Sequence, residues 1–241
     1  MFLTGGILSP NFYSIYVDDL LAKLKKSKKG CYVLGHFAAT LFYADDMAIL
    51  APSLRGLESL LKICGDYCSE FDICLNAKKS KILYFGKRVS TSYNVTLDGR
   101  KIDWVDEWIY LGVTLKSAKV FDCSAKERVK KFYRCTNSIL RIDGKSNDMV
   151  MLHLLESHCV PLLTYAIEVT HISNRDERRE MRVAYNCLFR KIFQNRWSES
   201  VSALQAFLGR PTWEQLVEKR RNGFLKRVRQ ADPSLLSYQL L

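Results

Sequence analysis

The strongest constraint on the fold of this chain is a change of hydrophobic pattern near residues 116–123. Before it, short apolar runs typical of strands alternate with helical stripes, for example at 40–43, 47–50 and 108–115. After it, apolar residues recur only at helical spacing, over 124–142, 147–170, 174–195 and 212–230. The sequence therefore predicts an α+β half followed by an all-helical half.

Three local signals define the first half. Ser9-Pro10 is a good helix start, because Ser caps a helix and Pro fits its first position. The apolar stripe after Pro52-Ser53 predicts an amphipathic helix over 54–71 that packs across the sheet. Asp98-Gly99 is a preferred hairpin turn. We expect strands near 32–34, 40–43, 47–50, 82–85, 93–97, 101–105 and 109–115.

The chain is strongly basic. It has 37 Lys and Arg against 25 Asp and Glu, a net charge of +12, and 48% hydrophobic residues, which excludes disordered and collagen-like classes. The excess lies late, since residues 175–229 hold 14 basic and 6 acidic side chains. Such a charge suits a polyanion, either nucleic acid or an anionic membrane, although solubility alone is an equally open interpretation.

The eight cysteines do not indicate a secreted disulfide framework. They are scattered through predicted helices and strands, with no signal-peptide pattern before them. Free thiols in a reducing compartment follow, so we expect a nuclear or cytoplasmic protein that is not secreted. The most apolar stretch, 149–170, contains Glu156 and Glu168, which favours a buried helix over a membrane span.

Two Tyr-x-Asp-Asp tetrapeptides could carry metal chemistry, at residues 16–19 and 43–46. A carboxylate pair suits Mg²⁺, which prefers hard oxygen ligands held rigidly. Asp45 and Asp46 lie between two apolar strands and would be presented at a hairpin tip, whereas Asp18 and Asp19 lie inside a helix. The simpler interpretation of Asp18 and Asp19 is that they lie on a solvated helix face, with Asp19 and Lys23 as an i, i+4 pair.

Four segments occur in a telling order: Gly5-Gly6-Ile7-Leu8-Ser9-Pro10, Tyr43-Ala44-Asp45-Asp46, Asn76-Ala77-Lys78-Lys79-Ser80-Lys81 and Tyr110-Leu111-Gly112-Val113. Together they make the sequence resemble the reverse transcriptases of non-LTR (LINE-type) retrotransposons over most of its length. The resemblance implies a partial polymerase palm over 1–118, an antiparallel sheet with packed helices. It also implies a helical thumb-like region over 119–172 and a basic helical C-terminal region over 173–241.

The resemblance also implies roles for individual residues. Asp45 would be the main Mg²⁺ ligand and Asp46 a weaker one, and Lys79, rather than Lys78 or Lys81, would be the general acid to the leaving pyrophosphate. A solvated basic turn is the alternative for these lysines. The implied positioning residues for template and nucleotide are Gly5, Gly6, Ser9 and Pro10; the primer contacts are Tyr43, Ala44, Tyr110, Leu111 and Gly112; the contacts to duplex phosphates are Arg128, Lys130, Lys131 and Arg134.

The implied function is RNA-directed DNA polymerisation with two Mg²⁺ ions, an RNA template, a DNA primer and deoxynucleoside triphosphates, and with no membrane partner. In the family, fingers and another catalytic Asp precede the segment that begins at Gly5, where this sequence has only residues 1–4. We therefore expect the chain to be inactive alone, unless a second chain supplies the missing palm and fingers. The alternative is a non-catalytic nucleic-acid-binding protein derived from such an element.

Overall fold

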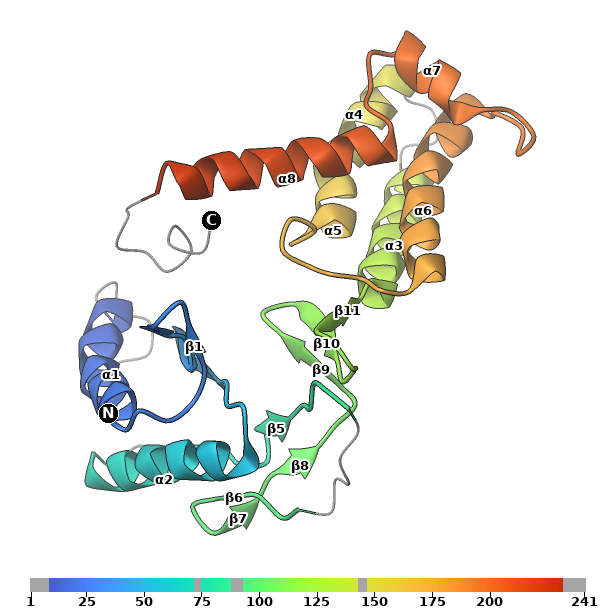
Figure 1. Cartoon of the computed structure of the whole chain (residues 1–241). Coiled ribbons are helices and arrows are strands. Elements are labelled where there is room, and N and C mark those ends of the chain that lie inside the picture. The colour runs from blue at the N-terminus through green and yellow to red at the C-terminus, as the bar shows by residue number, and fades with distance from the viewer. Residues whose placement is uncertain (1–8, 72–74, 88–92, 143–146, 232–241) are drawn as a thin grey trace. The chain divides into compact units, whose positions relative to one another are not determined.

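A computed structural model describes residues 9–71, 75–87, 93–142 and 147–231, and these residues fold into two units (Figure 1). The first unit holds described residues up to Ile82 together with those from 93 to Trp104. The second holds residues from Leu83 to 87 and from Val105 to Ala231. Both units contain helices and short, mostly antiparallel strands, so the predicted α+β class is confirmed.

The first unit begins with a helix and a series of short strands. Its elements are α1 (Ser9–Lys26), β1 (Tyr32–Val33), β2 (His36–Phe37), β3 (Thr40–Tyr43), β4 (Asp46–Ile49), α2 (Leu54–Glu70), β5 (Lys81–Ile82), β6 (Thr96–Leu97), β7 (Arg100–Lys101) and β8 (Asp103–Trp104). The Ser53 side chain accepts a hydrogen bond from the Gly56 amide and caps the start of α2.

The core of the first unit forms where α1 and α2 cover the β3–β4 hairpin. Leu24 of α1 and Leu60 and Cys64 of α2 are fully buried, and Phe42 and Met47 of the hairpin pack against them. The helix over 54–70 therefore packs against the hairpin, as its apolar stripe predicts. This packing fixes the strands whose connecting turn carries the Asp pair.

A second core of the same unit is built around β5 to β8. Asp98 and Gly99 both have positive φ, 51° and 70°, which is the hairpin turn that the sequence predicts. The strands are shorter than expected. The pairing of β7 with β6 ends at Lys101, and Asp103 of β8 then pairs with Lys81 of β5. Residues 83–85, expected to continue the strand from Ile82, have no regular structure.

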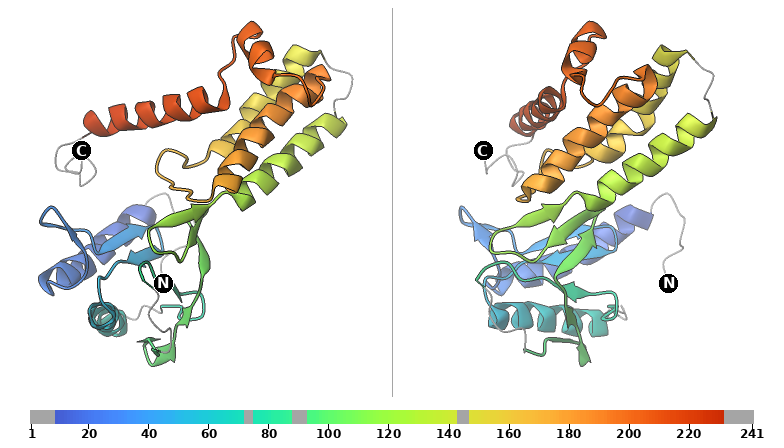
Figure 2. Two further views of the ribbon diagram at one scale, coloured as in Figure 1. Left: turned by 45° about the vertical axis from the view of Figure 1, so that its right-hand side comes forward. Right: turned by 90° about the vertical axis from the view of Figure 1, so that its right-hand side faces the viewer.

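The second unit is mainly helical. Its elements are β9 (Glu107–Tyr110), β10 (Val113–Lys116), β11 (Asp122–Ser124), α3 (Lys126–Ile142), α4 (Asp148–His158), α5 (Val160–Thr164), α6 (Arg175–Phe193), α7 (Val201–Phe207) and α8 (Trp213–Arg229). Helices α3 to α6 lie side by side in both views of Figure 2 and share one core. The first helix of the predicted C-terminal region thus packs directly onto the predicted thumb-like region.

Two predictions of element bounds are wrong in this unit. The single strand expected over 109–115 is a hairpin, because Leu111 and Gly112 adopt positive φ, 46° and 77°, and reverse the chain. The helix expected over 147–170 breaks after His158 and ends at Thr164. Pro161 explains the break, since proline donates no backbone hydrogen bond and restricts the residue before it.

Among the described helices, none is long and apolar enough to cross a membrane. The cysteines at 31, 64, 123, 135, 159 and 187 are free thiols. Burial raises the pKa of the Cys64 thiol to about 12, so this side chain behaves as an apolar core residue at neutral pH.

Candidate active site

The Asp pair lies at the end of the β3–β4 hairpin. Tyr43 and Asp46 are the last paired residues of the two strands, so Ala44 and Asp45 form a two-residue turn. Ala44 has φ of 50°, the positive φ that tight hairpin turns require. All four residues are exposed, and Tyr43 retains 65% of its accessible surface. The hairpin therefore presents two neighbouring carboxylates, next to an aromatic ring, on a support that is packed from below.

These carboxylates suit a hard divalent cation. Within the described ranges neither Asp45 nor Asp46 has a hydrogen-bond or ion-pair partner in the protein, so their oxygens are available to a ligand. Adjacent carboxylate oxygens are donors that Mg²⁺ prefers, with water and phosphate oxygens completing its shell. No group of three or more His, Cys, Asp or Glu side chains in the described part of the chain is arranged to hold a metal. The hairpin thus supplies a partial ligand set.

The Tyr-x-Asp-Asp segment at residues 16–19 has a different setting. It lies in α1, where Val17 and Leu20 are buried and Asp18 and Asp19 are exposed on the helix surface. The expected pair of Asp19 with Lys23 is wrong.

The Lys23 ammonium is instead 2.7 Å from a Glu70 carboxylate oxygen and lies 4.8 Å from the centre of the Tyr67 ring. The attraction of the ring and of the α2 carboxylate explains why Lys23 turns away from its own helix.

The turn before β5 holds the three candidate lysines. The Asn76 side chain accepts a hydrogen bond from the Lys79 amide at 3.1 Å and shapes this turn. Lys78 and Lys79 are exposed, whereas the Lys81 ammonium lies 2.7 Å from an Asp103 carboxylate oxygen. The hydrogen bond from Lys81 lowers the pKa of the Asp103 carboxyl. Lys81 therefore has a structural partner, and Lys78 and Lys79 are the side chains that could reach a substrate.

The predicted primer contacts of the second unit lie on the β9–β10 turn. The Leu111 carbonyl accepts a hydrogen bond from the Tyr165 hydroxyl at 2.9 Å. A Cβ at Gly112 would lie 3.3 Å from the Tyr165 ring, so glycine is needed both for its positive φ and for this close approach. Tyr165 thus holds the turn, and sequence spacing gives no signal for it because its partner lies 54 residues away.

Arg128 corrects the predicted set of phosphate contacts. It is 5% exposed, and its Nη1 donates to the Tyr165 carbonyl at 2.6 Å, so it faces the protein core rather than a duplex. Burial lowers the pKa of its guanidinium. Helical spacing places Arg128 beside the other basic residues. It does not reveal that the Tyr165 backbone, which lies after the end of α5, packs against the Arg128 guanidinium.

The remaining basic residues of α3 are accessible. Lys130, Lys131 and Arg134 are exposed, and the Lys130 ammonium lies 2.8 Å from Glu127 on the same helix. Gly5 and Gly6, the expected template-positioning glycines, lie outside the described residues. Ser9 and Pro10 are the first two residues of α1, so the helix begins one residue before the expected first position at Pro10.

Comparison with known proteins gives one family match. Residues 3–115 match the family described as reverse transcriptase (RNA-dependent DNA polymerase). The match includes the β3–β4 hairpin, the turn before β5 and the β9–β10 turn, and it ends before α3.

Three curated relatives extend over more of the chain. The chain is 22% identical over 202 residues to the RNA-directed DNA polymerase from mobile element jockey of Drosophila melanogaster, and 26% identical over 206 residues to that of Drosophila funebris. Each alignment covers 80% of this chain and 22% of the relative, so the chain spans about a fifth of their length. It is also 25% identical over 171 residues to an uncharacterised transposon-derived protein of Caenorhabditis elegans, covering 66% of the chain and 58% of that protein.

Proposed function

We propose that the β3–β4 hairpin supplies metal ligands for RNA-directed DNA synthesis, on the premise that residues 3–115 are part of a LINE-type reverse transcriptase, the family that they match. The observation that carries the proposal is the position of Asp45 and Asp46. They are exposed, without protein partners in the described part of the chain, at the tip of a hairpin that α1 and α2 hold from below.

Reverse transcriptases as a family use Mg²⁺, and Asp45 and Asp46 are the residues of this chain that would hold it. When bound, the metal would lower the pKa of the primer 3′-hydroxyl and neutralise charge on the triphosphate. Two ions need more carboxylate oxygens than these two residues supply. In the proposal a further acid completes the site, either from residues outside those described or from a second chain.

The chain's other predicted site residues would act on the substrates. Tyr43 and Ala44 would lie beside the primer terminus, and the β9–β10 turn at Tyr110–Gly112 would hold the primer strand. Lys79 would donate a proton to the leaving pyrophosphate, for which its exposed ammonium is suited. These roles assign residues 1–118 to the palm, and they require an RNA template, a DNA primer and deoxynucleoside triphosphates.

The helices after the matched segment would bind the product duplex. Lys131 and Arg134, with Lys130, form the exposed basic side of α3, and phosphate contacts of this kind fix a duplex without reading its sequence. We propose that residues 119–172 are the thumb and that 173–241 form a basic C-terminal region. Tyr165 would be a positioning residue, because it holds the β9–β10 turn from the thumb side.

The two Tyr-x-Asp-Asp segments provide a matched test. The assay is primer extension on an RNA template with Mg²⁺, using the full-length product of the gene that encodes these residues. Asp45→Asn is expected to lower the rate by about 10³-fold or more, since a metal ligand is lost. Asp18→Asn removes the same charge from the same tetrapeptide pattern in α1 and should leave the rate within about two-fold. Equal effects of the two substitutions would refute the assignment.

Template–primer binding without incorporation favours the alternative, a non-catalytic nucleic-acid-binding protein. The observation behind this second candidate is the net charge of +12 and its concentration on accessible helices. Retained binding by Asp45→Asn, in a full-length protein that never extends a primer, is the result that would select it.

A further inference from the structure

Helix α6 carries a row of arginines on one side. Arg175, Arg178, Arg179 and Arg182 follow the i, i+3, i+4, i+7 spacing of a single helix face, and all four are exposed. At 1.5 Å per residue the row is about 10 Å long. The opposite face of the same helix carries buried side chains such as Met181 and Leu188, which belong to the core.

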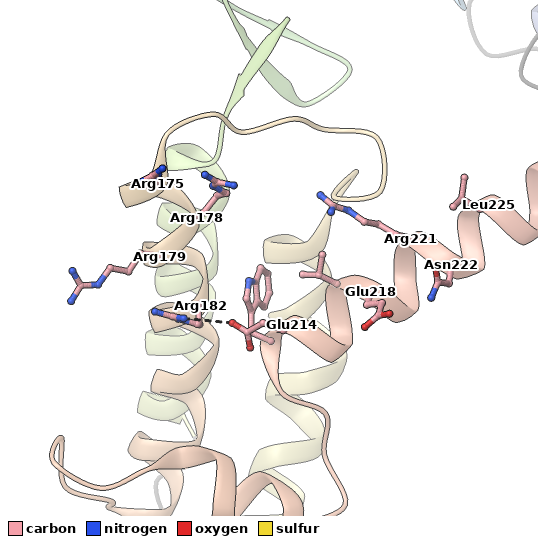
Figure 3. A pocket seen from close by; sticks show the side chains of 11 residues that line it. Arg175, Arg178, Arg179, Arg182, Glu214, Glu218, Arg221, Asn222 and Leu225 are labelled. Carbon is pink, nitrogen blue, oxygen red and sulfur yellow. Dashed lines mark ion pairs between the residues drawn. The ribbon is translucent and has the colours of Figure 1, made fainter. Parts of the chain in front are cut away.

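This row forms one wall of an open groove in the second unit. Figure 3 shows the four arginines along α6 and Glu214, Glu218, Arg221, Asn222 and Leu225 along α8. The groove has a volume of about 660 Å³, and Trp213 and Val217 also line it. Trp213 is 8% exposed, and its ring lies 5.7 Å from that of Tyr185 on α6, so the groove has a fixed apolar base.

Charge in the groove is not balanced from within. Its lining includes five arginines and two glutamates. Arg182 lies 3.7 Å from Glu214, as the dashed line in Figure 3 marks. Arg175, Arg179 and Arg221 have no ion-pair partner within the described ranges. These three guanidiniums therefore keep their hydrogen-bond donors available to a ligand.

The arrangement is costly for an isolated helix. Like charges at i, i+3 and i, i+4 repel one another and destabilise a helix. Arg175, Arg178 and Arg179 also lie in the first turns of α6, where the helix dipole disfavours positive charge. Asp176 and Glu177 offset part of this cost. A bound polyanion would turn this repulsion into a net attraction, because each phosphate neutralises an arginine and releases counterions.

We propose that this groove binds the sugar–phosphate backbone of a single-stranded nucleic acid. Guanidiniums recognise phosphate oxygens in a bidentate manner, and the half-buried Val217 and Leu225, together with the buried Trp213, give the groove an apolar base that suits unstacked bases. A duplex presents its phosphates on a convex surface and keeps its bases stacked inside, so it fits a concave groove poorly. The inference rests on the proposed function only for the class of ligand and does not involve Asp45 or Asp46.

The test is fluorescence anisotropy with a labelled 20-nucleotide single-stranded RNA in EDTA. Metal-free buffer keeps the result independent of polymerisation, so failure here leaves the proposed function standing. The triple variant Arg175→Gln, Arg179→Gln, Arg221→Gln removes three phosphate contacts. At about 0.7 per phosphate, the slope of log K against log salt should fall by about 2, and affinity at 0.1 M salt by about 100-fold.

The matched control is Lys219→Gln, Lys226→Gln, Arg227→Gln. It removes the same charge from exposed α8 residues that do not line the groove. It should change the slope by less than 1. Equal losses in the two triple variants would mean that net charge alone binds RNA, and no loss in the groove variant would also overturn the proposal.

Two further arms fix the mechanism and the ligand. Replacing the same three arginines by lysine keeps the charge and should keep most of the salt slope, whereas loss of the slope would indicate a structural role. Single-stranded DNA should compete with the RNA. If a duplex or a poly-glutamate peptide binds equally well with the same dependence on Arg175, Arg179 and Arg221, a single strand is not the ligand.

Discussion

Glu177 joins the sheet of the second unit to its helices. Its carboxylate is 3% exposed and accepts three hydrogen bonds. The Lys116 ammonium of β10 donates at 2.6 Å, the Ser124 hydroxyl of β11 at 2.9 Å, and the Ala125 amide just before α3 at 2.7 Å. One side chain on α6 therefore connects two strands and the start of another helix. Glu177→Ala removes all three bonds at once.

The cost of this substitution can be worked from the contacts. Breaking a buried ion pair by deleting one partner costs about 3–5 kcal/mol, because the other charge is left unpaired. Lys116 keeps 17% of its side-chain surface and lies 4.0 Å from a Glu107 carboxylate oxygen, so water and Glu107 recover part of this loss. The Ala125 amide and the Ser124 hydroxyl are left without their acceptor, at about 1 kcal/mol or more each. We expect a loss of about 3 kcal/mol in the free energy of unfolding at neutral pH.

The pH dependence has a definite sign. Burial raises the pKa of the Glu177 carboxyl, but the hydrogen bonds from Lys116 and Ala125 outweigh it and leave the pKa lowered. A carboxyl with a lowered folded-state pKa stabilises the fold above its unfolded value and loses that contribution as pH falls through the folded one. The difference between wild type and Glu177→Ala should therefore be constant near pH 7 and shrink below about pH 4.

Urea denaturation followed by circular dichroism at 222 nm measures the free energy of unfolding, and repeating it from pH 7 to pH 3 measures its pH dependence. Glu180→Ala is the control, since Glu180 is exposed on the same helix and its removal should change stability by less than about 0.5 kcal/mol. If Glu177→Ala costs no more than Glu180→Ala, or if the difference between Glu177→Ala and wild type grows as the pH falls, the reasoning is refuted.

Two further substitutions test the packing of the second unit. Gly112→Ala should lower its stability by about 1–2 kcal/mol in urea denaturation, because φ of 77° strains a residue with a Cβ; Gly65→Ala, in α2 with open space around it, should be neutral or stabilising, and the same sign for both would contradict this. Trp213→Ala should cost about 3–5 kcal/mol and expose the segment around Arg210 to trypsin, because Trp213 is the only buried residue of α8. Trp197→Ala, which removes a 71% exposed ring, should leave the digestion pattern unchanged.

The parts of the fold that the sequence predicts well are those with local causes. The apolar stripe of α2 and the turn at Asp98-Gly99 each depend on residues close in the chain, and the structure has both. Some errors have a local cause that an apolar pattern hides, as at Pro161, and others arise where distant residues decide. Pro161 signals a break in an otherwise apolar pattern, yet the two short helices on either side are held by contacts with α3 and α6. Arg128 is buried because Tyr165 returns to it from 37 residues away.

The two Tyr-x-Asp-Asp segments show how far a motif can predict a site. In both, the residue before the Asp pair is small or branched and apolar, and both pairs are exposed. What differs is the backbone beneath them. In α1 successive side chains are turned by about 100° around the helix axis, so Asp18 and Asp19 diverge.

At the tip of the β3–β4 hairpin, Asp45 is in the turn itself and Asp46 begins the returning strand. Asp46 pairs with Tyr43, so the backbone next to the turn is fixed by the two paired strands. Two carboxylates that project together from a hairpin tip could bind one cation jointly with a substrate phosphate. Two carboxylates that diverge on a helix surface each face solvent separately. The tetrapeptide alone does not carry this distinction. The apolar runs at 40–43 and 47–50, which flank the turn at residues 44–45, carry it, and this is why flanking patterns are a better guide to a candidate metal site than the motif.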